Sequence, residues 1–399
     1  MTNLQKPKIV LTVQEYQFGG ASKQVFWIMQ SLLKRGMDVV LITNARDTWL
    51  GQQIRESGLN FKVYYTSWIQ RDFHLIKDLL SLFFIMSVLR KEKPDYLLLA
   101  GAKLIVQGSI LGWLCRIPHR FAHLHGLGTY PKSPVYPIML FMNRLSGKLG
   151  TTFITVSQDD YRTLLKHQVV PPAQVRTVYN GIEINKIQQG IKGRFRKQFH
   201  IPKDAFVVAM IARLASQKRC DDFIRIMVKL CQQYDHIYGC LVGDGILRVS
   251  LQKQIDQTGF SDRIFISGFI ENMPDVYQDI NLSVLMTHYE GLPITLCESA
   301  ANGIPIIANP VCGNPEIVLH GVNGYLAENV DEAVNYARLL IHDEALRRQF
   351  GEHGKRIVYE HFDATKQTEY LLDTILLPEQ QILMATEAYA LDYSTPLNI

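Results

Sequence analysis

The chain has 399 residues, 47% of them hydrophobic and 20% charged, and its mean hydropathy is close to zero. This is the composition of a globular protein, and the length suits two or three domains, which excludes fibrous, collagen-like and disordered classes. The net charge is +5.

That charge is unevenly distributed. Residues 1–190 contain 23 Lys and Arg against 11 Asp and Glu, whereas the remaining residues contain 19 against 26. A basic first half fits an anionic partner, such as phospholipid headgroups or a phosphate-bearing substrate. Nucleic acid also fits the sign, but the chain has no nucleic-acid motif and no interleaving of aromatic and basic residues, so we predict no nucleic-acid partner.

The beginning of the chain and its cysteines point to the cytoplasm. None of the six cysteines forms a C-x-x-C pair, and the N-terminus carries no apolar signal region before a cleavage site. We therefore expect reduced thiols. The longest apolar run, "LLSLFFIMSVL" at 79–89, is too short for the roughly 20 residues of a spanning helix. We interpret it as a buried helix end, with a helix that grazes a membrane as the alternative.

The first half alternates short apolar runs with helical patterns. Helices are predicted at 19–36, which ends in the C-cap signal Gly36, and near 68–92. The predicted strands are 8–13, 39–44, 96–101, 121–126 and 153–157. Strand–helix–strand alternation predicts a doubly wound parallel sheet.

The same alternation restarts after a segment at 178–204 that is rich in glycine and charge. A helix is predicted from 221, and the predicted strands are 206–214, 238–245, 264–268, 282–287 and 304–309. The chain is therefore predicted to hold two Rossmann-like α/β domains. Because ligands bind beyond the carboxyl ends of the strands in such sheets, two domains facing each other would enclose a cleft.

Residues at the ends of the first-half strands are the first site candidates. Gly19 and Gly20 follow the first strand and open a helix, where a backbone can approach phosphate, although a tight turn without a ligand explains them equally well. The spacing is not G-x-G-x-x-G, which counts against a dinucleotide site. His123 and His125 end a strand on one face; a structural role and a site role are equally open, and no third metal ligand is near in sequence.

The second half carries cations at the end of its first strand. Arg213 and Lys218 in "IARLASQK" suit phosphate oxygens, with a solvated loop as the alternative. Gly243 in "VGDG" ends the next strand, either as turn chemistry or as a close approach to a nucleotide.

The stretch "EGLPITLCESAANGIPIIA" at 290–308 is predicted to hold a short helix over 293–302. Pro293 suits its first position, and Gly303 with Pro305 stops it. Its N-terminus has free N–H groups and a partial positive charge. Glu290 before the helix and Glu298 within it could each hold a sugar diol, with a diphosphate between them at the helix end. The apolar neighbours of Glu298 favour its burial.

Taken in order, these segments resemble the family 4 retaining glycosyltransferases, of the group 1 glycosyl transferases, which have the two-Rossmann GT-B fold. The stretch 290–308 resembles the E-x7-E signature of the family, and "IARLASQK" resembles its Arg-x4-Lys motif. Further matches are the Gly-Gly loop, "HLHG", "VYNGIE", "LVGDG" and the final "EHFDATKQTEYLLDTIL". The chain departs from the family in having Arg219 where a glycine usually follows the motif lysine.

The resemblance implies roles for individual residues. Arg213 and Lys218 would bind the donor diphosphate and stabilise it as it leaves, Glu290 would contact the donor sugar, and His125 would lie near that sugar. Glu298 would hold the ribose. Further donor-binding positions are Gly19, Gly20, Gly243, Gly291, Leu292, Pro293, Ile294 and Thr295. No metal or other cofactor is expected, because cations and a helix N-terminus would neutralise the leaving diphosphate.

The resemblance also implies a domain plan and an activity. Residues 1–190 would form the acceptor-binding domain, 191–360 the nucleotide-sugar-binding domain, and 361–378 a helix that packs back on the first domain. The tail at 379–399 is assigned nothing.

The expected activity is a metal-independent hexosyltransferase. It would move a hexosyl or N-acetylhexosaminyl group from a UDP- or GDP-sugar to a glycan or lipid-linked acceptor, with retention, in capsule, lipopolysaccharide or exopolysaccharide biosynthesis. The basic half would contact the anionic inner face of the cell membrane. The alternatives are a sugar-nucleotide epimerase of the same fold and a non-catalytic nucleotide-sugar-binding protein; a nicotinamide or flavin oxidoreductase is disfavoured by the absent glycine fingerprint.

Overall fold

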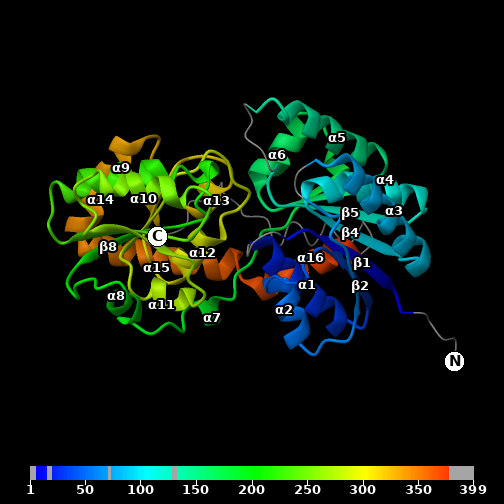
Figure 1. Cartoon of the computed structure of the whole chain (residues 1–399), viewed down its shortest axis with the longest axis horizontal. Coiled ribbons are helices and arrows are strands. Elements are labelled where there is room, and N and C mark those ends of the chain that lie inside the picture. The colour runs from blue at the N-terminus through cyan, green and yellow to red at the C-terminus, as the bar shows by residue number, and fades with distance from the viewer. Residues whose placement is uncertain (1–5, 16–19, 71–72, 128–132, 377–399) are drawn as a thin grey trace. The chain divides into compact units, whose positions relative to one another are not determined.

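The computed structural model describes residues 6–15, 20–70, 73–127 and 133–376. The chain forms two compact units, of which the first contains residues 1–180 and 366–399 and the second residues 181–365 (Figure 1). Each unit is a parallel β-sheet with helices on both faces, so the prediction of two Rossmann-like domains is confirmed.

The first unit has a seven-stranded sheet in the order β3-β2-β1-β4-β5-β6-β7. Its strands are β1 (Lys8–Val13), β2 (Asp38–Thr43), β3 (Lys62–Tyr65), β4 (Tyr96–Ala100), β5 (His119–Leu124), β6 (Thr152–Thr155) and β7 (Val175–Thr177). All pairings are parallel. The central strands are continuous apolar runs because helices cover both of their faces. The two edge strands, β3 and β7, were not predicted.

Two helical layers cover this sheet. One core contains α1 (Gly20–Lys34), α2 (Trp49–Glu56) and part of α16 (Ala364–Leu376), and the other contains α3 (Leu75–Glu92), α4 (Ala102–Leu114), α5 (Tyr136–Lys148) and α6 (Gln158–Lys166). Side chains alternate between the two cores along each strand, so that Leu11 joins the first and Val10 the second. A short 3-10 turn (Pro172–Gln174) precedes β7.

The apolar run at 79–89 lies within α3, and its interpretation as a buried helix end is only half right. Ile85, Val88 and Leu89 are buried against the sheet, whereas Leu79, Leu80 and Phe83 are exposed. A single helix laid on a sheet can bury only one of its sides, so the apolar residues on the opposite side stay outside the core.

The second unit has a six-stranded sheet in the order β10-β9-β8-β11-β12-β13. Its strands are β8 (Phe206–Ile211), β9 (Ile237–Val242), β10 (Ile264–Gly268), β11 (Leu282–Leu285), β12 (Ile306–Ala308) and β13 (Gly324–Leu326). Its helices are α7 (Ile184–Ile187), α8 (Arg194–Gln198), α9 (Cys220–Cys231), α10 (Arg248–Asp256), α11 (Met273–Tyr277), α12 (Ile294–Ala301), α13 (Asn314–Ile317), α14 (Val330–His342) and α15 (Glu344–His361).

The boundary between the units falls ten residues before the expected position at 190. Residues 181–190 belong to the second unit because their backbone is tied to it. The Ile182 N–H donates to the Phe362 carbonyl at 2.8 Å, and a Cβ on Gly190 would lie 2.1 Å from the Pro274 carbonyl oxygen. Helix α16 then returns the chain to the first unit, where Tyr370, Leu371, Leu372 and Ile375 join the α1 core.

Candidate functional site

Strands β8 and β11 are neighbours at the point where the second sheet reverses its winding. The chain leaves β8 through α9 toward β9 on one side, and leaves β11 through α12 toward β12 on the other. The loops after β8 and β11 therefore diverge above the carboxyl edge. A topological switch point of this kind is where open α/β sheets bind ligands.

The loop after β8 carries the two predicted cations. Arg213 is exposed, and Lys218 ends a 3-10 turn (Ser216–Lys218). Arg219 follows with a φ of 44° and makes an ion pair with Asp222. This position is left-handed, which is the conformation that glycine adopts most easily. Arg219 therefore adopts the turn conformation that a glycine would provide at this position. Its side chain is held by Asp222.

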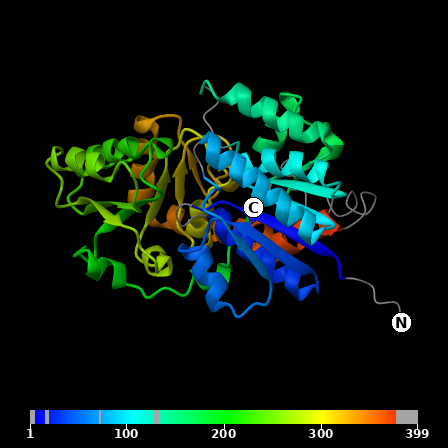
Figure 2. The ribbon, with the colours of Figure 1, turned by 45° about the vertical axis from the view of Figure 1, so that its right-hand side comes forward.

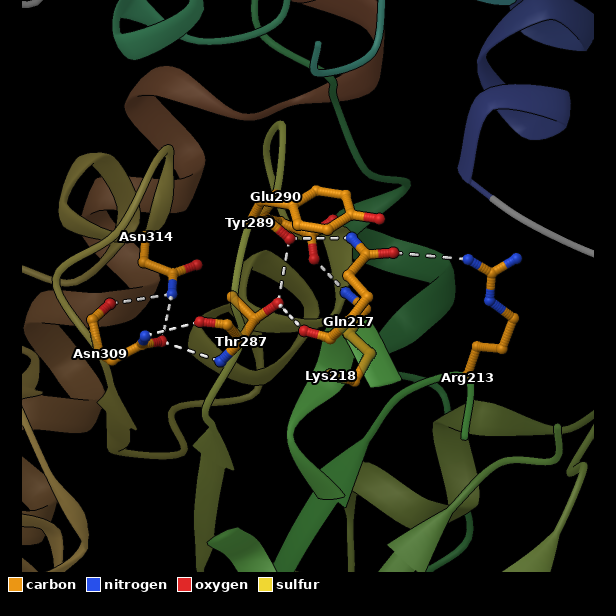
Figure 3. A network of polar contacts seen from close by, with 8 residues as sticks. All are labelled: Arg213, Gln217, Lys218, Thr287, Tyr289, Glu290, Asn309 and Asn314. Atoms are coloured by element: carbon orange, nitrogen blue, oxygen red, sulfur yellow. Dashed lines mark hydrogen bonds and ion pairs between the residues drawn. The ribbon is translucent and has the colours of Figure 1, made fainter. Parts of the chain in front are cut away.

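Gln217 joins the loops after β8 and β11 (Figure 3). Its side-chain amide donates to the Tyr289 carbonyl at 2.8 Å, while its own backbone carbonyl accepts from the His288 N–H at 2.8 Å. The Thr287 hydroxyl lies 2.9 Å from the same Gln217 carbonyl. The Arg213 guanidinium lies 3.5 Å from the Gln217 side-chain oxygen. These bonds fix the two loops as one surface.

Lys218 and Glu290 form an ion pair across these loops. Both side chains are mostly buried, so their attraction is less screened than that of a surface pair. An anionic ligand that bound the Lys218 ammonium would compete with Glu290 for it. Two residues 72 positions apart, both predicted as site residues, are thus brought into contact.

Helix α12 begins at Ile294, one residue later than predicted. Pro293 occupies the N-cap position with a φ of −75° and a ψ of 102°, and its carbonyl accepts from the Leu296 N–H at 3.0 Å. The first N–H groups of a helix lack intrahelical partners, so Ile294 and Thr295 present donors at this end. Gly291, Leu292 and Pro293 lead into the helix and are buried.

Glu298 is buried within α12, as its neighbours predicted, with 7% of its surface exposed. Its carboxylate accepts a hydrogen bond from the Tyr277 hydroxyl at 2.7 Å. Burial and then the Glu298 charge raise the pKa of Tyr277 well above its usual value, so the tyrosine remains a donor. The carboxylate is therefore held in position by a neutral, buried hydroxyl.

Two asparagines beside Thr287 support the loop after β11 (Figure 3). Asn309 accepts from the Thr287 N–H at 3.0 Å and donates to the Thr287 carbonyl at 2.7 Å, and Asn314 donates to the Asn309 carbonyl at 2.9 Å. A Cβ on Gly313 would lie 2.1 Å from the Gly291 carbonyl oxygen. Sequence reasoning missed these supports, and also Gln217 and Tyr277. The position of Asn309 as the last residue of the strand predicted at 304–309 was a signal that could have found it.

Gly243 adopts a φ of 145° where β9 ends beside β8. A Cβ there would lie 2.0 Å from the Ala212 carbonyl oxygen. The glycine is therefore required for close approach of two backbones at the carboxyl edge, next to the loop that carries Arg213.

The remaining predicted residues belong to the first unit. His123 is the last residue but one of β5 and His125 follows the strand, with ring centroids 4.2 Å apart. Burial lowers the pKa of His125 to about 4, so its ring is neutral at physiological pH. Nδ1 of His123 and Nε2 of His125 are buried without a protein partner. Gly20 is the first residue of α1, and Gly19 lies outside the described residues.

Within the described ranges, no group of three or more His, Cys, Asp or Glu side chains has the arrangement of a metal site. Among the same residues, none of the helices combines the length and the apolar character that crossing a membrane requires.

Two family models match the chain and divide it as the fold does. Residues 19–181 match the glycosyl transferase 4-like domain, and residues 191–357 match glycosyl transferases group 1. Each match covers one Rossmann-like domain, and the second contains the loops after β8 and β11 and helix α12.

Individual relatives are distant but extend over most of the chain. One is the Escherichia coli UDP-Gal:alpha-D-GlcNAc-diphosphoundecaprenol alpha-1,3-galactosyltransferase, 23% identical over 78% of this chain and 83% of its own. Another is the Staphylococcus aureus capsular polysaccharide biosynthesis glycosyltransferase CapM, 23% identical over 87% and 93% of the two chains. Among solved structures, Anabaena HepE in complex with UDP and glucose has a TM-score of 0.78 at 21% identity, covering 93% of this chain and 100% of HepE.

Proposed function

Because the chain belongs to the glycosyl transferases group 1 family and has the two-Rossmann GT-B fold, we propose that it is a retaining hexosyltransferase that uses a nucleotide diphosphate sugar. The donor is a UDP- or GDP-linked hexose or N-acetylhexosamine. UDP-sugars are the first donors to test, because the E. coli relative is named for UDP-galactose and HepE was solved in complex with UDP and glucose.

One observation carries the proposal. The structure brings Lys218 and Glu290 into contact at the switch point, in the loops that follow β8 and β11, and the second of these loops leads into α12 with the buried Glu298. Cations and helix N–H groups suit a diphosphate, whereas carboxylates suit sugar hydroxyls. We assign the diphosphate to Arg213, Lys218 and the backbone of 291–295, the donor sugar to Glu290, and the ribose to Glu298. We assign Gly243 to the donor site because its lack of a side chain lets the end of β9 approach the loop that carries Arg213. Gly19, Gly20 and His125 keep the donor roles that the family resemblance implies.

In the proposed reaction, the bond between the anomeric carbon and the diphosphate oxygen breaks on the same face on which the acceptor oxygen bonds to that carbon. The acceptor proton passes to the leaving diphosphate, so no separate base is required. Charge builds up on the diphosphate as this bond breaks, and Arg213 and Lys218 stabilise it there. We propose that no metal ion takes part.

The acceptor in this proposal is a glycan or a lipid-linked sugar of cell-surface polysaccharide biosynthesis, as the names of the capsular and diphosphoundecaprenol relatives suggest. The enzyme would work in the cytoplasm, with peripheral contact between its basic first half and the anionic inner face of the membrane.

Calorimetric titration with UDP- and GDP-sugars in the presence of a chelator tests the donor site. We expect one donor class to bind, with affinity lost in Arg213→Ala and Glu298→Ala and kept in Lys253→Ala, which removes an exposed cation of the same unit. Retention of donor binding in all three variants would contradict the assigned site.

Product analysis then tests the reaction. Transfer to an acceptor with an α-linked product from an α-linked donor is expected in the presence of chelator. Release of a free epimer in the absence of an acceptor would favour the epimerase. Donor binding without any turnover would favour the non-catalytic binding protein. Loss of turnover on chelation would refute the metal-independent step alone.

A further inference from the structure

Helix α3 of the first unit presents large apolar side chains to solvent. Leu75, Ile76, Leu79, Leu80 and Phe83 are between 37% and 65% exposed, and Phe73 just before the helix is 81% exposed. Their spacing of one, three and four residues places them on one side over the first half of the helix. A surface helix ordinarily turns polar residues outward, so this side differs from a solvated one.

The opposite side of α3 carries polar groups that the protein satisfies internally. Asp78 is buried, accepting from the His74 N–H at 3.0 Å and from the Lys103 ammonium at 2.5 Å. Ser81 is buried and accepts from the Gln107 amide at 3.2 Å. The helix therefore buries polar residues while it exposes leucine and phenylalanine. A high overall hydrophobicity of the segment would not produce this arrangement.

Helix α5 repeats this arrangement. Val135 at its N-cap and Ile138 and Phe141 in its first half are 49–63% exposed. Helix α4 packs against both α3 and α5, on the face of the sheet that all three share. Figure 2 turns α3, drawn in light blue, toward the viewer. Both helices connect parallel strands, so both begin at the carboxyl edge of the sheet, where such folds bind their ligands.

We propose that the outer sides of α3 and α5 enter the interfacial region of an anionic phospholipid bilayer. The face consists of Leu75, Ile76, Leu79, Leu80, Phe83, Val135, Ile138 and Phe141 and is called the apolar helix face below. Clusters of exposed apolar side chains on neighbouring helices mark an interaction site, and apolar side chains backed by basic ones are the combination that holds a helix in a membrane interface.

Charge complementarity selects the bilayer as the occupant. The last turn of α3 contains exposed Arg90 and Lys91, and α5 ends in exposed Lys148. These cations suit anionic headgroups while the first halves of the helices enter the acyl boundary. Trp68 packs against Phe84 of α3 with ring centroids 6.0 Å apart, and tryptophan is enriched at membrane–water interfaces.

This inference goes beyond a general electrostatic contact of the basic half, because it assigns the binding to insertion of named apolar side chains. It rests on the proposed function for its purpose, since a lipid-linked acceptor is presented at a bilayer surface. Its chemistry is independent of the proposed donor-binding residues, none of which belongs to the apolar helix face.

Sedimentation of the full chain with phosphatidylcholine vesicles, with and without phosphatidylglycerol, tests the apolar helix face. We expect the double variant Ile76→Glu/Phe83→Glu to bind anionic vesicles about tenfold more weakly than the wild type. Ile246→Glu is the matched control, because Ile246 is an equally apolar residue of the second unit with 91% exposure. Circular dichroism checks that the variants fold. We expect them to fold, because the side chains of Ile76, Phe83 and Ile246 are all exposed.

Salt separates insertion from simple attraction. At about 1 M salt the electrostatic screening length falls to about 3 Å, so attraction between charges is largely removed. If the apolar side chains insert, part of the vesicle binding survives this salt, and the fluorescence of Trp68 shifts to shorter wavelength. The variant Trp68→Phe shows that the shift comes from this tryptophan. Absence of vesicle binding, complete loss of it in salt, or equal binding by the double variant would overturn the proposal. Self-association that the double variant abolishes, without vesicle binding, would instead identify a second copy as the occupant. Donor titration of the double variant should be unchanged, so failure here is distinguishable from failure of the proposed function.

Discussion

Glu92 at the C-terminus of α3 offers a stability test whose size follows from its contacts. Its side chain is 2% exposed and accepts from the Tyr64 hydroxyl at 2.7 Å, from Lys8 at 2.9 Å and from Lys62 at 3.0 Å. A carboxylate is ordinarily unfavourable at the end of a helix. Here it ties the last turn of α3 to β1 and β3, so we expect Glu92→Gln to destabilise the first unit.

The pKa of Glu92 sets the magnitude. Burial alone would raise it, but the Tyr64, Lys8 and Lys62 hydrogen bonds outweigh that effect and lower it from 4.5 to about 2. This difference between the folded and the unfolded pKa corresponds to a stabilisation of the folded state by about 3 kcal/mol. Because the folded pKa lies below the unfolded one, this stabilisation is complete above about pH 4.5 and disappears as the pH falls toward 2.

Differential scanning calorimetry measures the effect. A loss of about 3 kcal/mol in a unit of this size lowers its Tm by about 6–12 °C near pH 7, and the gap between wild type and variant should narrow in acid. Glu344→Gln, which removes an exposed pair with Arg348, should shift the second unit's transition by no more than a degree or two. A Glu92→Gln protein with wild-type Tm, or a gap that is unchanged near pH 3, would refute the reasoning.

Three further predictions concern the candidate site. Glu290→Gln frees the ammonium it pairs with, so we expect UDP to bind roughly fivefold more tightly by calorimetry while kcat/KM for sugar transfer falls roughly 10- to 100-fold. Tyr277→Phe removes the donor to Glu298, so the KM for the nucleotide sugar should rise about tenfold with kcat little changed; an effect on kcat alone would contradict a ribose role. Gly243→Ala places a Cβ 2.0 Å from a carbonyl oxygen, so denaturant unfolding should show a loss of about 2–3 kcal/mol in stability, and donor binding should be lost. The control Gly259→Ala, whose Cβ would meet nothing within 4 Å, should lose about 1 kcal/mol in stability and still bind the donor.

Central strands were predictable to within a few residues, and so was the edge strand β10, whereas the edge strands β3, β7 and β13 were not. Strands such as β1 and β8 are buried on both faces and read as unbroken apolar runs in the sequence. Edge strand β3 is half-exposed, and β7 and β13 have three residues each, too few for a periodic pattern. Their positions follow from pairing with a neighbour, which is a tertiary property.

The site shows the same division. Arg213, Lys218, Glu290 and Glu298 were recognisable because each lies just beyond a strand or on a helix whose ends are marked by proline and glycine. The sequence by itself thus determined which residues reach the carboxyl edge and their charge.

Only the tertiary structure decided which of them touch and what holds them. Gln217 meets the Tyr289 carbonyl because β8 and β11 are adjacent in the sheet, although 72 residues separate the two. The outward side of α3 is likewise a tertiary result. Leu79 and Leu89 are equally apolar in sequence, and only packing against the sheet buries one and exposes the other, because burial depends on which side of the helix the rest of the chain covers.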